Sequence, residues 1–403
     1  MLVWMWMATE RKQGLHFILQ TLTSPISRSI KDKSEDQYPF SCLWINYRQV
    51  SFEKIREQRE EARSPFEETT FNFIRDWLSG EETFHVSTSG STGNPKVISL
   101  SRMQMVMSAQ QTARKIGLQK FSRALVCIDT KYIGGKMMLV RCLTTGLSIM
   151  ALDPSANPLI KIPVDKCVQF TAFVPYQINA VLESKHPHLL NNLDKVLIGG
   201  APLGSGNREQ LDRFQCECYE TYGMTETVSH IALRLVNTKM KRQYFETLPG
   251  VEISKDDRGC LVISADYLQK PIITNDLVEI PERGKFLWLG RWDTVINTGG
   301  VKVVPEKIEK ELETIFHQVN FHNRFFIAAL PDDRLGNKIV LVIEGVQFSS
   351  EILAQSLNAL KSAVSPFEFP KEVYTVPKFA FTETEKIDRN QTLSGITLLP
   401  SLK

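Results

Sequence analysis

The sequence contains little that would place the protein in a membrane or outside the cell. Its 403 residues include no uncharged hydrophobic run of the length that spans a bilayer. The apolar opening, residues 1–8, is short and lacks the basic residues and the cleavage site of a signal peptide. Met1, Met5 and Met7 are all candidate translation starts. We therefore expect a soluble protein without membrane insertion.

Paired cysteines and charge of one sign are also sparse. The seven cysteines are an odd number spread over the chain, and Cys216 and Cys218 have no second pair at metal-binding spacing. This pattern favours reduced, mostly buried thiols and a cytoplasmic location over a disulfide framework. The net charge is +3 and Lys and Arg form no run, so we expect no nucleic-acid partner.

What is present is an ordinary globular composition with an alternating pattern. Hydrophobic residues make up 42% of the chain and charged residues 23%, which is usual for a globular protein. Short apolar runs alternate with helical segments, as at 124–128, 136–145, 147–152 and 195–198. This alternation predicts an α/β fold with a mostly parallel sheet and helices on its faces. Ligands of such sheets bind beyond the carboxyl ends of the strands.

The pattern changes after residue 230. Short strand-like segments separated by turn residues follow, and a helix that begins at Pro305 belongs to a final α+β module. The length of the chain allows more than one domain. We therefore predict a large N-terminal domain, residues 1–290, and a small C-terminal domain, residues 291–403.

A loop rich in hydroxyl groups and glycine occupies residues 87–96. Its glycines let the backbone approach a ligand, successive N–H groups can bind an anion, and Lys96 adds a positive charge. It is not a Walker A loop, because Pro95 stands where that motif needs glycine. By itself such a loop is either a phosphate-binding loop or a plain surface linker.

Five motifs in order decide between these interpretations. They are STSGSTGNPK at 87–96, YGMTET at 222–227, TND at 274–276, GRWDTVINTGG at 290–300 and ETEKIDR at 383–389. Together they resemble the motifs of the adenylate-forming superfamily of acyl-CoA ligases, the AMP-dependent synthetases and ligases. The resemblance implies a large domain followed by a small mobile one. It also implies a large domain abbreviated at its N-terminus, because many members carry a longer segment before the first motif.

The resemblance implies roles in ATP binding. The first loop would close on the β- and γ-phosphates, Thr225 would contact the α-phosphate, and Glu226 would hold Mg²⁺, a cation that prefers oxygen ligands. Tyr222 would stack on adenine, and Asp276 would bind the ribose. The full set implied for ATP is Thr88, Ser89, Gly90, Ser91, Thr92, Gly93, Lys96, Gly199, Gly200, Ala201, Tyr222, Gly223, Thr225, Asp276 and Arg291.

Catalysis and domain movement are assigned in the same way. Lys386 matches the lysine that bridges the acid's carboxylate and the α-phosphate, where an ammonium stabilises charge that develops on phosphorus. It joins Thr225 and Glu226 as the implied catalytic residues. Asp293 takes the position of the hinge between the domains, and the segment Gly299–Gly300 that of a CoA-binding turn.

Two positions depart from the family pattern. Asn275 stands where the third motif usually has glycine, and Glu385 stands where glycine usually precedes the catalytic lysine. Both changes leave the functional side chain beside them in place. They therefore bear on the geometry of the loops more than on the assigned roles.

Three further pieces narrow the substrate. YIGGKMMLVR at 132–141, FVPYQ at 173–177 and LIGGAPL at 197–203 resemble o-succinylbenzoate–CoA ligases of menaquinone biosynthesis, and other short aryl-acid ligases share similar pieces. A dianionic aromatic acid needs a cation for the carboxylate that does not react. Lys136 and Arg141 are candidates, or ordinary helix-face residues, and Gly200 is a further candidate substrate contact. His230 has apolar neighbours, which favour a core residue over a substrate contact.

Three functions remain open. The first is an ATP-dependent acid–CoA ligase that uses ATP, Mg²⁺, CoA and a small acid such as 2-succinylbenzoate. The second is an enzyme that adenylates another aromatic acid and loads it onto CoA or a carrier protein; this chain contains no carrier domain. The third is a non-catalytic nucleotide-binding relative. Because this chain retains Lys386 and Glu226, which degenerate members of the family usually lose, the sequence disfavours that function. The residues do not predict an oligomeric state.

Overall fold

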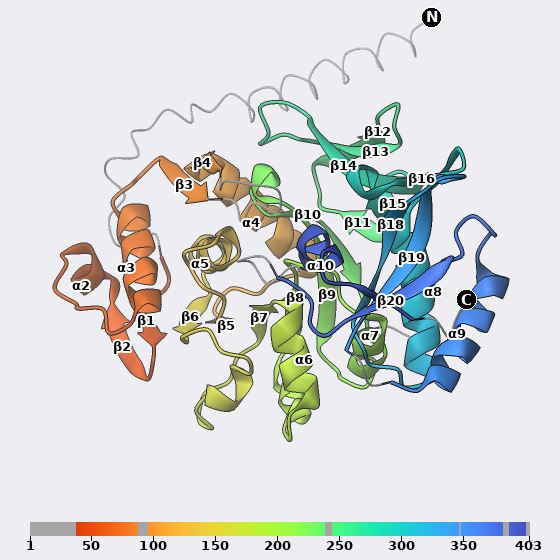
Figure 1. Ribbon diagram of the computed structural model, residues 1–403. Coiled ribbons are helices and arrows are strands. Elements are labelled where there is room, and N and C mark those ends of the chain that lie inside the picture. Colours follow the sequence, from red (N-terminus) through yellow and green to blue (C-terminus); the bar gives the residue numbers. More distant parts are fainter. Residues whose placement is uncertain (1–37, 88–95, 238–243, 346–347, 382–386, 400–403) are drawn as a thin grey trace, which may run out of the picture. The chain divides into compact units, whose positions relative to one another are not determined.

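A computed structural model describes residues 38–87, 96–237, 244–345, 348–381 and 387–399. Within residues 39–403, which form one compact unit, a 13-stranded sheet runs through most of the chain (Figure 1). In spatial order its strands are β12 (Val251–Lys255), β13 (Cys260–Ala265), β14 (Ile272–Glu282), β15 (Lys285–Arg291), β11 (Phe245–Thr247), β10 (His230–Leu235), β9 (Glu217–Gly223), β8 (Lys195–Ile198), β7 (Phe170–Phe173), β5 (Arg123–Val126), β6 (Ser148–Ala151), β1 (Cys42–Ile45) and β2 (Arg48–Ser51).

The sheet has a parallel and an antiparallel part. Strands β9, β8, β7, β5, β6 and β1 pair in parallel in that order. From β9 through β10, β11 and β15 to β12, every neighbouring pair is antiparallel. The fold class is thus α/β, as predicted, and the parallel pairing lies within residues 42–223. Because parallel strands end at one edge, the segments after β8 and β9 lie side by side.

Helices cover the parallel part. Those described in the sheet-bearing region are α2 (Phe52–Arg56), α3 (Pro65–Leu78), α4 (Arg102–Ile116), α5 (Ile133–Thr145), α6 (Pro175–Glu183) and α7 (Ser205–Leu211). Helix α4 begins with the capping box that its sequence predicts: the Ser101 hydroxyl accepts from Gln104 N, and the Gln104 side chain accepts from Ser101 N. It ends at Gly117, whose φ of 65° suits glycine at a helix C-terminus.

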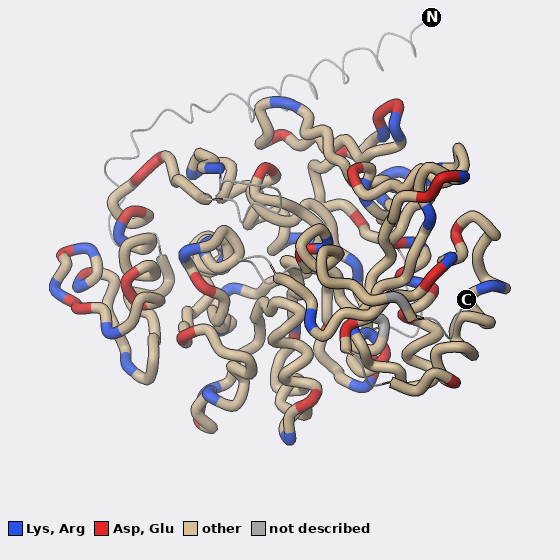
Figure 2. Tube along the Cα trace, in the orientation of Figure 1, with Lys and Arg blue, Asp and Glu red and all other residues tan. Residues whose placement is uncertain are grey.

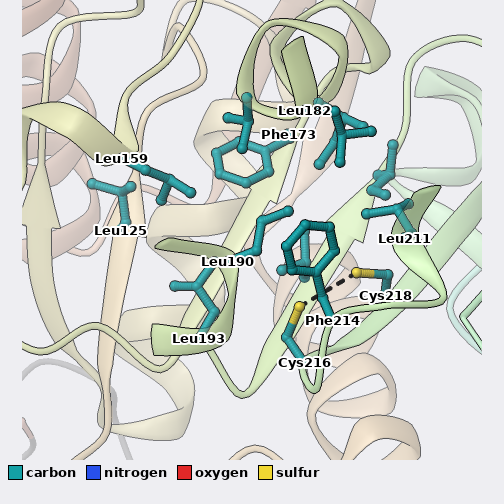
Figure 3. Close-up of a cluster of buried hydrophobic side chains, with 14 of the residues drawn as sticks. Leu125, Leu159, Phe173, Leu182, Leu190, Leu193, Leu211, Phe214, Cys216 and Cys218 are labelled. Carbon is teal, nitrogen blue, oxygen red and sulfur yellow. Dashed lines mark hydrogen bonds between the residues drawn. The ribbon is translucent and has the colours of Figure 1, made fainter. Parts of the chain in front are cut away.

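A large apolar core lies between α6, α7 and one face of the parallel strands (Figure 3). Leu125, Phe173 and Ile198 point into it from three strands, and Ile178 and Leu211 from the two helices. Each fully buried side chain of this size stabilises the fold by about 1.5–3 kcal/mol. Helices α4 and α5 take no part in this cluster; they pack on each other, and α5 lies against β5 and β6.

The C-terminal part has a sheet and a core of its own. Its four strands are β18 (Phe325–Asp332), β19 (Gly336–Glu344), β20 (Glu372–Val376) and β21 (Thr397–Leu398). Two amphipathic helices, α8 (Pro305–Gln318) and α9 (Ser350–Ala363), bury one face each in that core. Pro305 stands in the first turn of α8, as predicted. The domain boundary at residue 291 stays a prediction.

Besides the two larger sheets and their helices, the described residues form two hairpins and a short helix. Strands β3 (Thr83–Ser87) and β4 (Val97–Ser101) pair antiparallel on either side of the first motif, with Ser87 opposite Val97. Strands β16 (Ile296–Thr298) and β17 (Val301–Val303) form the second hairpin. Helix α10 (Arg389–Leu393) follows the last motif, and Arg389 holds it to α8 through Glu309, with Nη2 to Oε2 at 3.0 Å.

The segment 51–63 is rich in Glu, Lys and Arg, a pattern that favours a solvated helix, but it is helical over only part of its length. Helix α2 ends at Arg56, and Gln58 has a φ of 57°. Arg48 of β2 forms ion pairs with Glu60 and Glu67, and its Nη2 donates to the Glu61 carbonyl at 3.1 Å. These contacts hold the residues after Gln58 against the sheet edge. The residues after Gln58 therefore form an ion-paired loop and not the solvated helix that their composition favours.

Charge and thiols are distributed as the composition suggests. Figure 2 shows Lys and Arg interspersed with Asp and Glu along the trace. All seven cysteines are free, and five of them are buried; Cys167 is exposed and Cys42 is half-buried. Among the described residues, no helix combines the length and the apolar character needed to cross a membrane.

Candidate active site

The predicted adenine and ribose residues meet beside the carboxyl end of β9. The Tyr222 hydroxyl donates to Asp276 Oδ2 at 2.6 Å, although the two residues lie on β9 and β14. Burial and the Asp276 charge raise the pKa of Tyr222 well above its ordinary value, so the phenol stays protonated and donates. The ring packs on Phe286 and Phe245, at centroid distances of 5.0 and 5.7 Å. The packed Tyr222 ring thus holds its hydroxyl in place against the Asp276 carboxylate.

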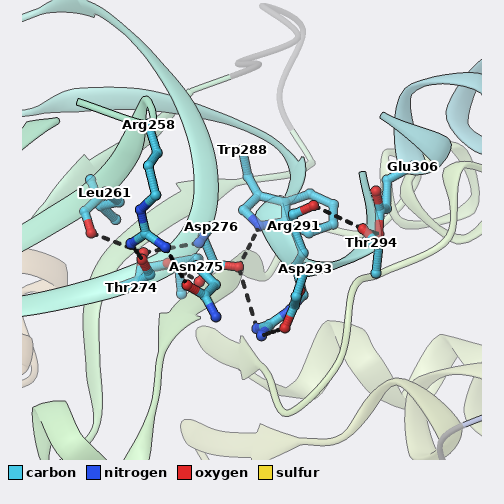
Figure 4. Close-up of polar contacts among 11 residues, drawn as sticks. Arg258, Leu261, Thr274, Asn275, Asp276, Trp288, Arg291, Asp293, Thr294 and Glu306 are labelled. Carbon is cyan, nitrogen blue, oxygen red and sulfur yellow. Dashed lines mark hydrogen bonds and ion pairs between the residues drawn. The ribbon is translucent and has the colours of Figure 1, made fainter. Parts of the chain in front are cut away.

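A tryptophan that the sequence did not single out holds the second oxygen of Asp276. Trp288 Nε1 donates to Asp276 Oδ1 at 3.0 Å, and Arg291 Nη1 lies 3.8 Å from the same oxygen. Figure 4 shows Asp276 with both side chains turned toward it. Asp276 is 7% exposed, and a buried carboxylate needs hydrogen-bond partners of this kind.

Asp293, at the predicted hinge, is linked to Asp276 through Arg291. Arg291 forms a bidentate pair with Asp293, Nε to Oδ1 at 2.8 Å and Nη2 to Oδ2 at 2.6 Å. The hydrogen bonds and the charge of Arg291, with one hydrogen bond from Asn275, hold the pKa of Asp293 below its usual range. Asn275, one of the two departures from the family pattern, also accepts at Oδ1 from Arg258 Nη1 at 3.0 Å (Figure 4). The departure is therefore accommodated by a dedicated partner.

The loop after β8 lies close against β9. A Cβ at Gly199 would stand 2.1 Å from the Thr221 hydroxyl, so glycine is required there. Two residues beyond Ala201, Leu203 is held in place, because its N–H donates to Glu220 Oε1 at 3.1 Å. Glu220, on β9, is 3% exposed and pairs with Arg208 and Arg234. The predicted adenine loop is thus anchored to the strand that carries Tyr222.

The Thr225–Glu226 segment forms a short 3-10 turn, residues 225–227, between β9 and β10. Thr227 is buried and closes the turn, since its hydroxyl accepts from Met224 N at 3.0 Å and donates to the Ser229 carbonyl at 2.7 Å. Glu226 is exposed and Thr225 is half-buried. An exposed carboxylate in this place fits a hard cation that keeps most of its ligands from water and phosphate. Groups of three or more metal-binding side chains are absent from the described residues.

Arg141 reaches the same turn from α5. It is 2% exposed, and Nη2 donates to the Ser229 hydroxyl at 2.8 Å and to His230 Nδ1 at 3.3 Å. Burial lowers the pKa of Arg141 to about 10, which leaves it charged at neutral pH. Among the described residues no carboxylate pairs with it, and its Nε has no hydrogen-bond partner. A buried cation therefore stands directly behind Ser229.

His230 is a core residue, as its neighbours predicted. Because Arg141 must donate to Nδ1, the proton of the neutral ring lies on Nε2 and faces Thr112 Oγ1 at 2.9 Å. Thr112 in turn donates to the Ser108 carbonyl at 3.1 Å. Burial, with Arg141 adding repulsion, lowers the pKa of His230 well below its ordinary value. The histidine thus stays neutral and locks α4 and α5 to β10.

The predicted CoA segment forms a tight hairpin. Gly299 and Gly300, with φ of 56° and 80°, connect β16 to β17, and positive φ at both positions suits a two-residue turn. Gly299 N donates to the Leu335 carbonyl at 2.9 Å. Within the described ranges, no hydrogen bond or ion pair joins this hairpin to Asp276 or Tyr222. Lys136 likewise stays apart from Arg141: it is half-buried beside the Phe73 ring at 5.7 Å, and burial lowers its pKa.

Several predicted site residues lie outside the described ranges. They are the catalytic Lys386 and the loop residues Thr88, Ser89, Gly90, Ser91, Thr92 and Gly93. Of their neighbours, Lys96 is exposed, and Phe381 and Ile387 form a β-bridge across the last motif. Of the described candidates, Tyr222, Asp276, Arg291 and Asp293 form one contact group.

Comparison with known proteins supports the same family as the motifs do. The family model described as "AMP-binding enzyme" matches residues 15–259. The crystal structure of an acyl-CoA synthetase (AMP-forming)/AMP-acid ligase II-like protein from Dyadobacter fermentans is 38% identical, with 84% of this chain and 97% of that chain covered and a TM-score of 0.57.

Two further relatives carry more specific names. A 2-succinylbenzoate–CoA ligase from Staphylococcus aureus is 23% identical over 76% of this chain, and the chain spans 66% of that relative's length. An o-succinylbenzoate coenzyme A synthetase from Bacillus subtilis, solved with ATP and magnesium ion, is 18% identical with a TM-score of 0.65. The alignment covers 85% of this chain and 82% of that one. At this identity the second likeness concerns the fold alone.

Proposed function

Because the chain belongs to the family of AMP-binding enzymes, we propose that it is an ATP-dependent acid–CoA ligase whose acid carries a second carboxylate, with 2-succinylbenzoate of menaquinone biosynthesis as the leading candidate. The observation that supports the reaction class is the contact group of Tyr222, Asp276 and Arg291 at the edge where ligands of α/β sheets bind. The observation that supports a diacid is the buried Arg141.

Nucleotide binding follows from the contact group. Tyr222 presents an aromatic face backed by Phe286, on which adenine stacks, and Asp276 accepts hydrogen bonds from ribose hydroxyls. Gly199 lets the loop after β8 approach Thr221, the residue before Tyr222, more closely than a side chain would allow. Mg²⁺, held by Glu226 together with the phosphates, neutralises phosphate charge when bound.

The first half-reaction is adenylation. A carboxylate oxygen of the acid attacks the α-phosphorus, the bond to the bridging oxygen of pyrophosphate breaks, and an acyl-adenylate forms. Thr225 hydrogen-bonds the α-phosphate, and the Lys386 ammonium neutralises charge on the attacking and the transferred oxygens. Preorganised cations of this kind supply much of the rate enhancement of phosphoryl and nucleotidyl transfer.

The second half-reaction is thiolysis. The CoA sulfur, as the thiolate, attacks the acyl carbon of the mixed anhydride, the bond to the phosphate oxygen breaks, and AMP leaves as the thioester forms. Rotation about Asp293 withdraws Lys386 and brings the Gly299–Gly300 turn to the pantetheine arm. Two steps that need different groups in one closed site make such a hinge useful.

Arg141 supports the choice of acid. An unpaired buried cation costs several kcal/mol unless an anion or hydrogen bonds compensate it. Arg141 has neutral acceptors alone among the described residues, and one of them, the half-buried Ser229 hydroxyl, can pass a hydrogen bond outward. The carboxylate that does not react would accept that hydrogen bond and compensate the charge. Lys136, on the first turn of α5, has no such relation to the 225–230 turn.

Pyrophosphate exchange tests the proposal. Labelled pyrophosphate should enter ATP when a panel of aromatic mono- and diacids is supplied, with 2-succinylbenzoate the best substrate, and AMP should appear when CoA is added. Exchange without CoA-dependent AMP release would favour loading of a carrier protein. Absence of both would favour a non-catalytic nucleotide-binding relative.

A substitution separates the half-reactions. Lys386→Ala should abolish exchange yet largely spare thiolysis of a supplied acyl-adenylate by CoA. Lys378→Ala, which removes an exposed lysine of the same module, is the matched control and should leave both steps unchanged. Equal loss of both steps in Lys386→Ala would contradict the role of that lysine.

A further inference from the structure

Trp288 and Asp276 are brought together by an irregularity in the sheet. Asp276 pairs with Arg291 and Leu277 with Gly290, but the next pair is Val278 with Trp288. Leu289 is therefore an extra residue on β15, a β-bulge. In a regular pair Trp288 and Arg291, three residues apart, would point to opposite faces of the sheet.

The bulge changes that alternation. Residues opposite each other share a face, so Arg291 shares one with Asp276, and Trp288 shares one with Val278. Asp276 and Val278 are two residues apart and point to the same face. All four side chains thus lie together, and the indole N–H reaches Asp276 Oδ1 at 3.0 Å. Leu289, the residue that bulges, is 40% exposed.

The partners of Asp276 divide its two oxygens. Oδ2 accepts from Tyr222 at 2.6 Å, and Oδ1 accepts from Trp288 at 3.0 Å. The backbone adds a third restraint, because Asp276 N donates to the Thr274 hydroxyl at 3.0 Å. An ionised carboxylate has about four acceptor sites, so two remain for a ligand.

Without the indole N–H, Oδ1 would keep a single close cation. Arg291 lies 3.8 Å away, too far for a hydrogen bond but near enough to attract the carboxylate. The carboxylate would turn toward the guanidinium and change the direction of its free acceptor sites. The Trp288 hydrogen bond opposes that rotation.

We propose that Trp288 is a positioning residue that aims the Asp276 carboxylate at the ribose hydroxyls of the nucleotide, and that the Leu289 bulge exists to place it there. This inference rests on the proposed function, because it requires that Asp276 binds the ribose of ATP. It adds a residue outside all five motifs to the nucleotide site.

The test compares nucleotides with and without ribose hydroxyls. KM values for ATP, 2′-deoxy-ATP and 3′-deoxy-ATP are measured by pyrophosphate exchange in the wild-type protein and in Trp288→Phe, which keeps an aromatic ring and removes the N–H. For ATP we expect KM to rise about tenfold, the effect of one hydrogen bond to a charged group. For at least one deoxy analogue the rise should be clearly smaller, with kcat little changed.

Two controls keep the result interpretable. Trp44→Phe makes the same change at an indole that packs against Tyr47 and should alter no KM. Trp288→His retains a ring N–H and should fall between the wild type and Trp288→Phe. Partial unfolding lowers the active fraction for all three nucleotides alike, so it leaves the ratios of their KM values unchanged.

The outcomes separate the inference from the proposed function. If the wild type shows no exchange and equilibrium dialysis detects no ATP binding, the proposed function fails. If ATP binds but Trp288→Phe changes the KM of ATP and of both deoxy analogues by the same factor, or changes none, the inference alone is overturned.

Discussion

Arg141 donates to the Ser229 hydroxyl across 2.8 Å, which places a buried cation one hydrogen bond behind the turn that carries Thr225 and Glu226. At 2% exposure, Arg141 lies in the protein interior and not on a solvent-exposed face of α5. Desolvation of a charged group is costly, and neutral acceptors repay it incompletely. This arrangement has an energetic cost in the free protein, which under the proposed function the second carboxylate of the acid would offset.

Replacing this arginine should therefore affect activity more than stability. In Arg141→Gln we expect kcat/KM for 2-succinylbenzoate to fall by about 10–100-fold, the effect of a hydrogen bond to a charged group. The value for the analogue without the ring carboxylate should change little. The free energy of unfolding, from urea titration, should stay within about 1 kcal/mol of the wild type, because an unpaired charge is lost.

Lys136→Gln is the matched control for that experiment. It removes a half-buried cation from the same helix, beside the Phe73 ring. An equal loss for the diacid and the analogue in Arg141→Gln, or a diacid-specific loss in Lys136→Gln, would contradict the assignment of the second carboxylate to Arg141.

The neutral His230 should make stability depend on pH. Its pKa lies well below 6.5 in the folded protein because of burial, and near 6.5 in the unfolded chain. Below pH 6.5 the unfolded chain binds a proton that the folded protein does not, so stability is lost as the pH falls. The loss should approach about 1.4 kcal/mol per pH unit.

Urea titrations from pH 5 to pH 8 would measure this effect. His230→Gln keeps one donor and one acceptor and cannot titrate, so its unfolding free energy should fall less steeply below pH 6.5. Identical slopes for the two proteins would show that His230 is not the group responsible.

Glu220 should be a major contributor to stability. It is 3% exposed, accepts from Leu203 N, and compensates the charges of Arg208 and Arg234. Glu220→Ala leaves both arginines without that partner and should cost about 3–5 kcal/mol of unfolding free energy. Glu217→Ala, which breaks the half-exposed pair with Lys195, should cost less than about 1 kcal/mol. Comparable losses in the two variants would contradict the role given to burial.

The close approach of Gly199 to β9 can be tested with a pair of substitutions. Gly199→Ala brings a methyl group against the Thr221 hydroxyl and should weaken ATP binding by about tenfold or more, since 1.4 kcal/mol of strain suffices. Thr221→Ala removes that hydroxyl and leaves a Cβ separation of 3.5 Å, an ordinary contact. The double variant should therefore regain ATP affinity, measured by equilibrium dialysis. A double variant as weak as Gly199→Ala would place the obstruction elsewhere.

Thiol accessibility predicts the order of alkylation. Cys167 is exposed, whereas Cys127 and Cys142 are buried with their pKa raised to about 12 by burial. Iodoacetamide should label Cys167 first in the native protein, as read by peptide mass spectrometry. The buried pair Cys216 and Cys218, with Sγ atoms 3.6 Å apart (Figure 3), should react once the protein unfolds. Early labelling of either would show that the core opens in the native state.

Much of the fold and part of the site follow from local chemistry. The capping box at Ser101 and Gln104 and the start of α8 at Pro305 depend on neighbouring residues alone, and the structure confirms both. Strands β1 and β2 were not predicted, because β1 becomes a strand by pairing with β6, about a hundred residues later in the chain. A short segment carries no mark of such a distant partner.

The site residues also fall into those that short local motifs identify and those that only long-range contacts identify. The order of motifs along the chain was enough to assign the family and to nominate Tyr222, Asp276 and Arg291, because each motif is a short run of residue types. The roles of Trp288 and Ser229 depend on a β-bulge and on the crossing of α5 behind a turn. Likewise, whether Arg141 is a surface charge or a buried one depends on which face of α5 packs inward. Such features arise from contacts between distant segments, and the folded chain is where they are decided.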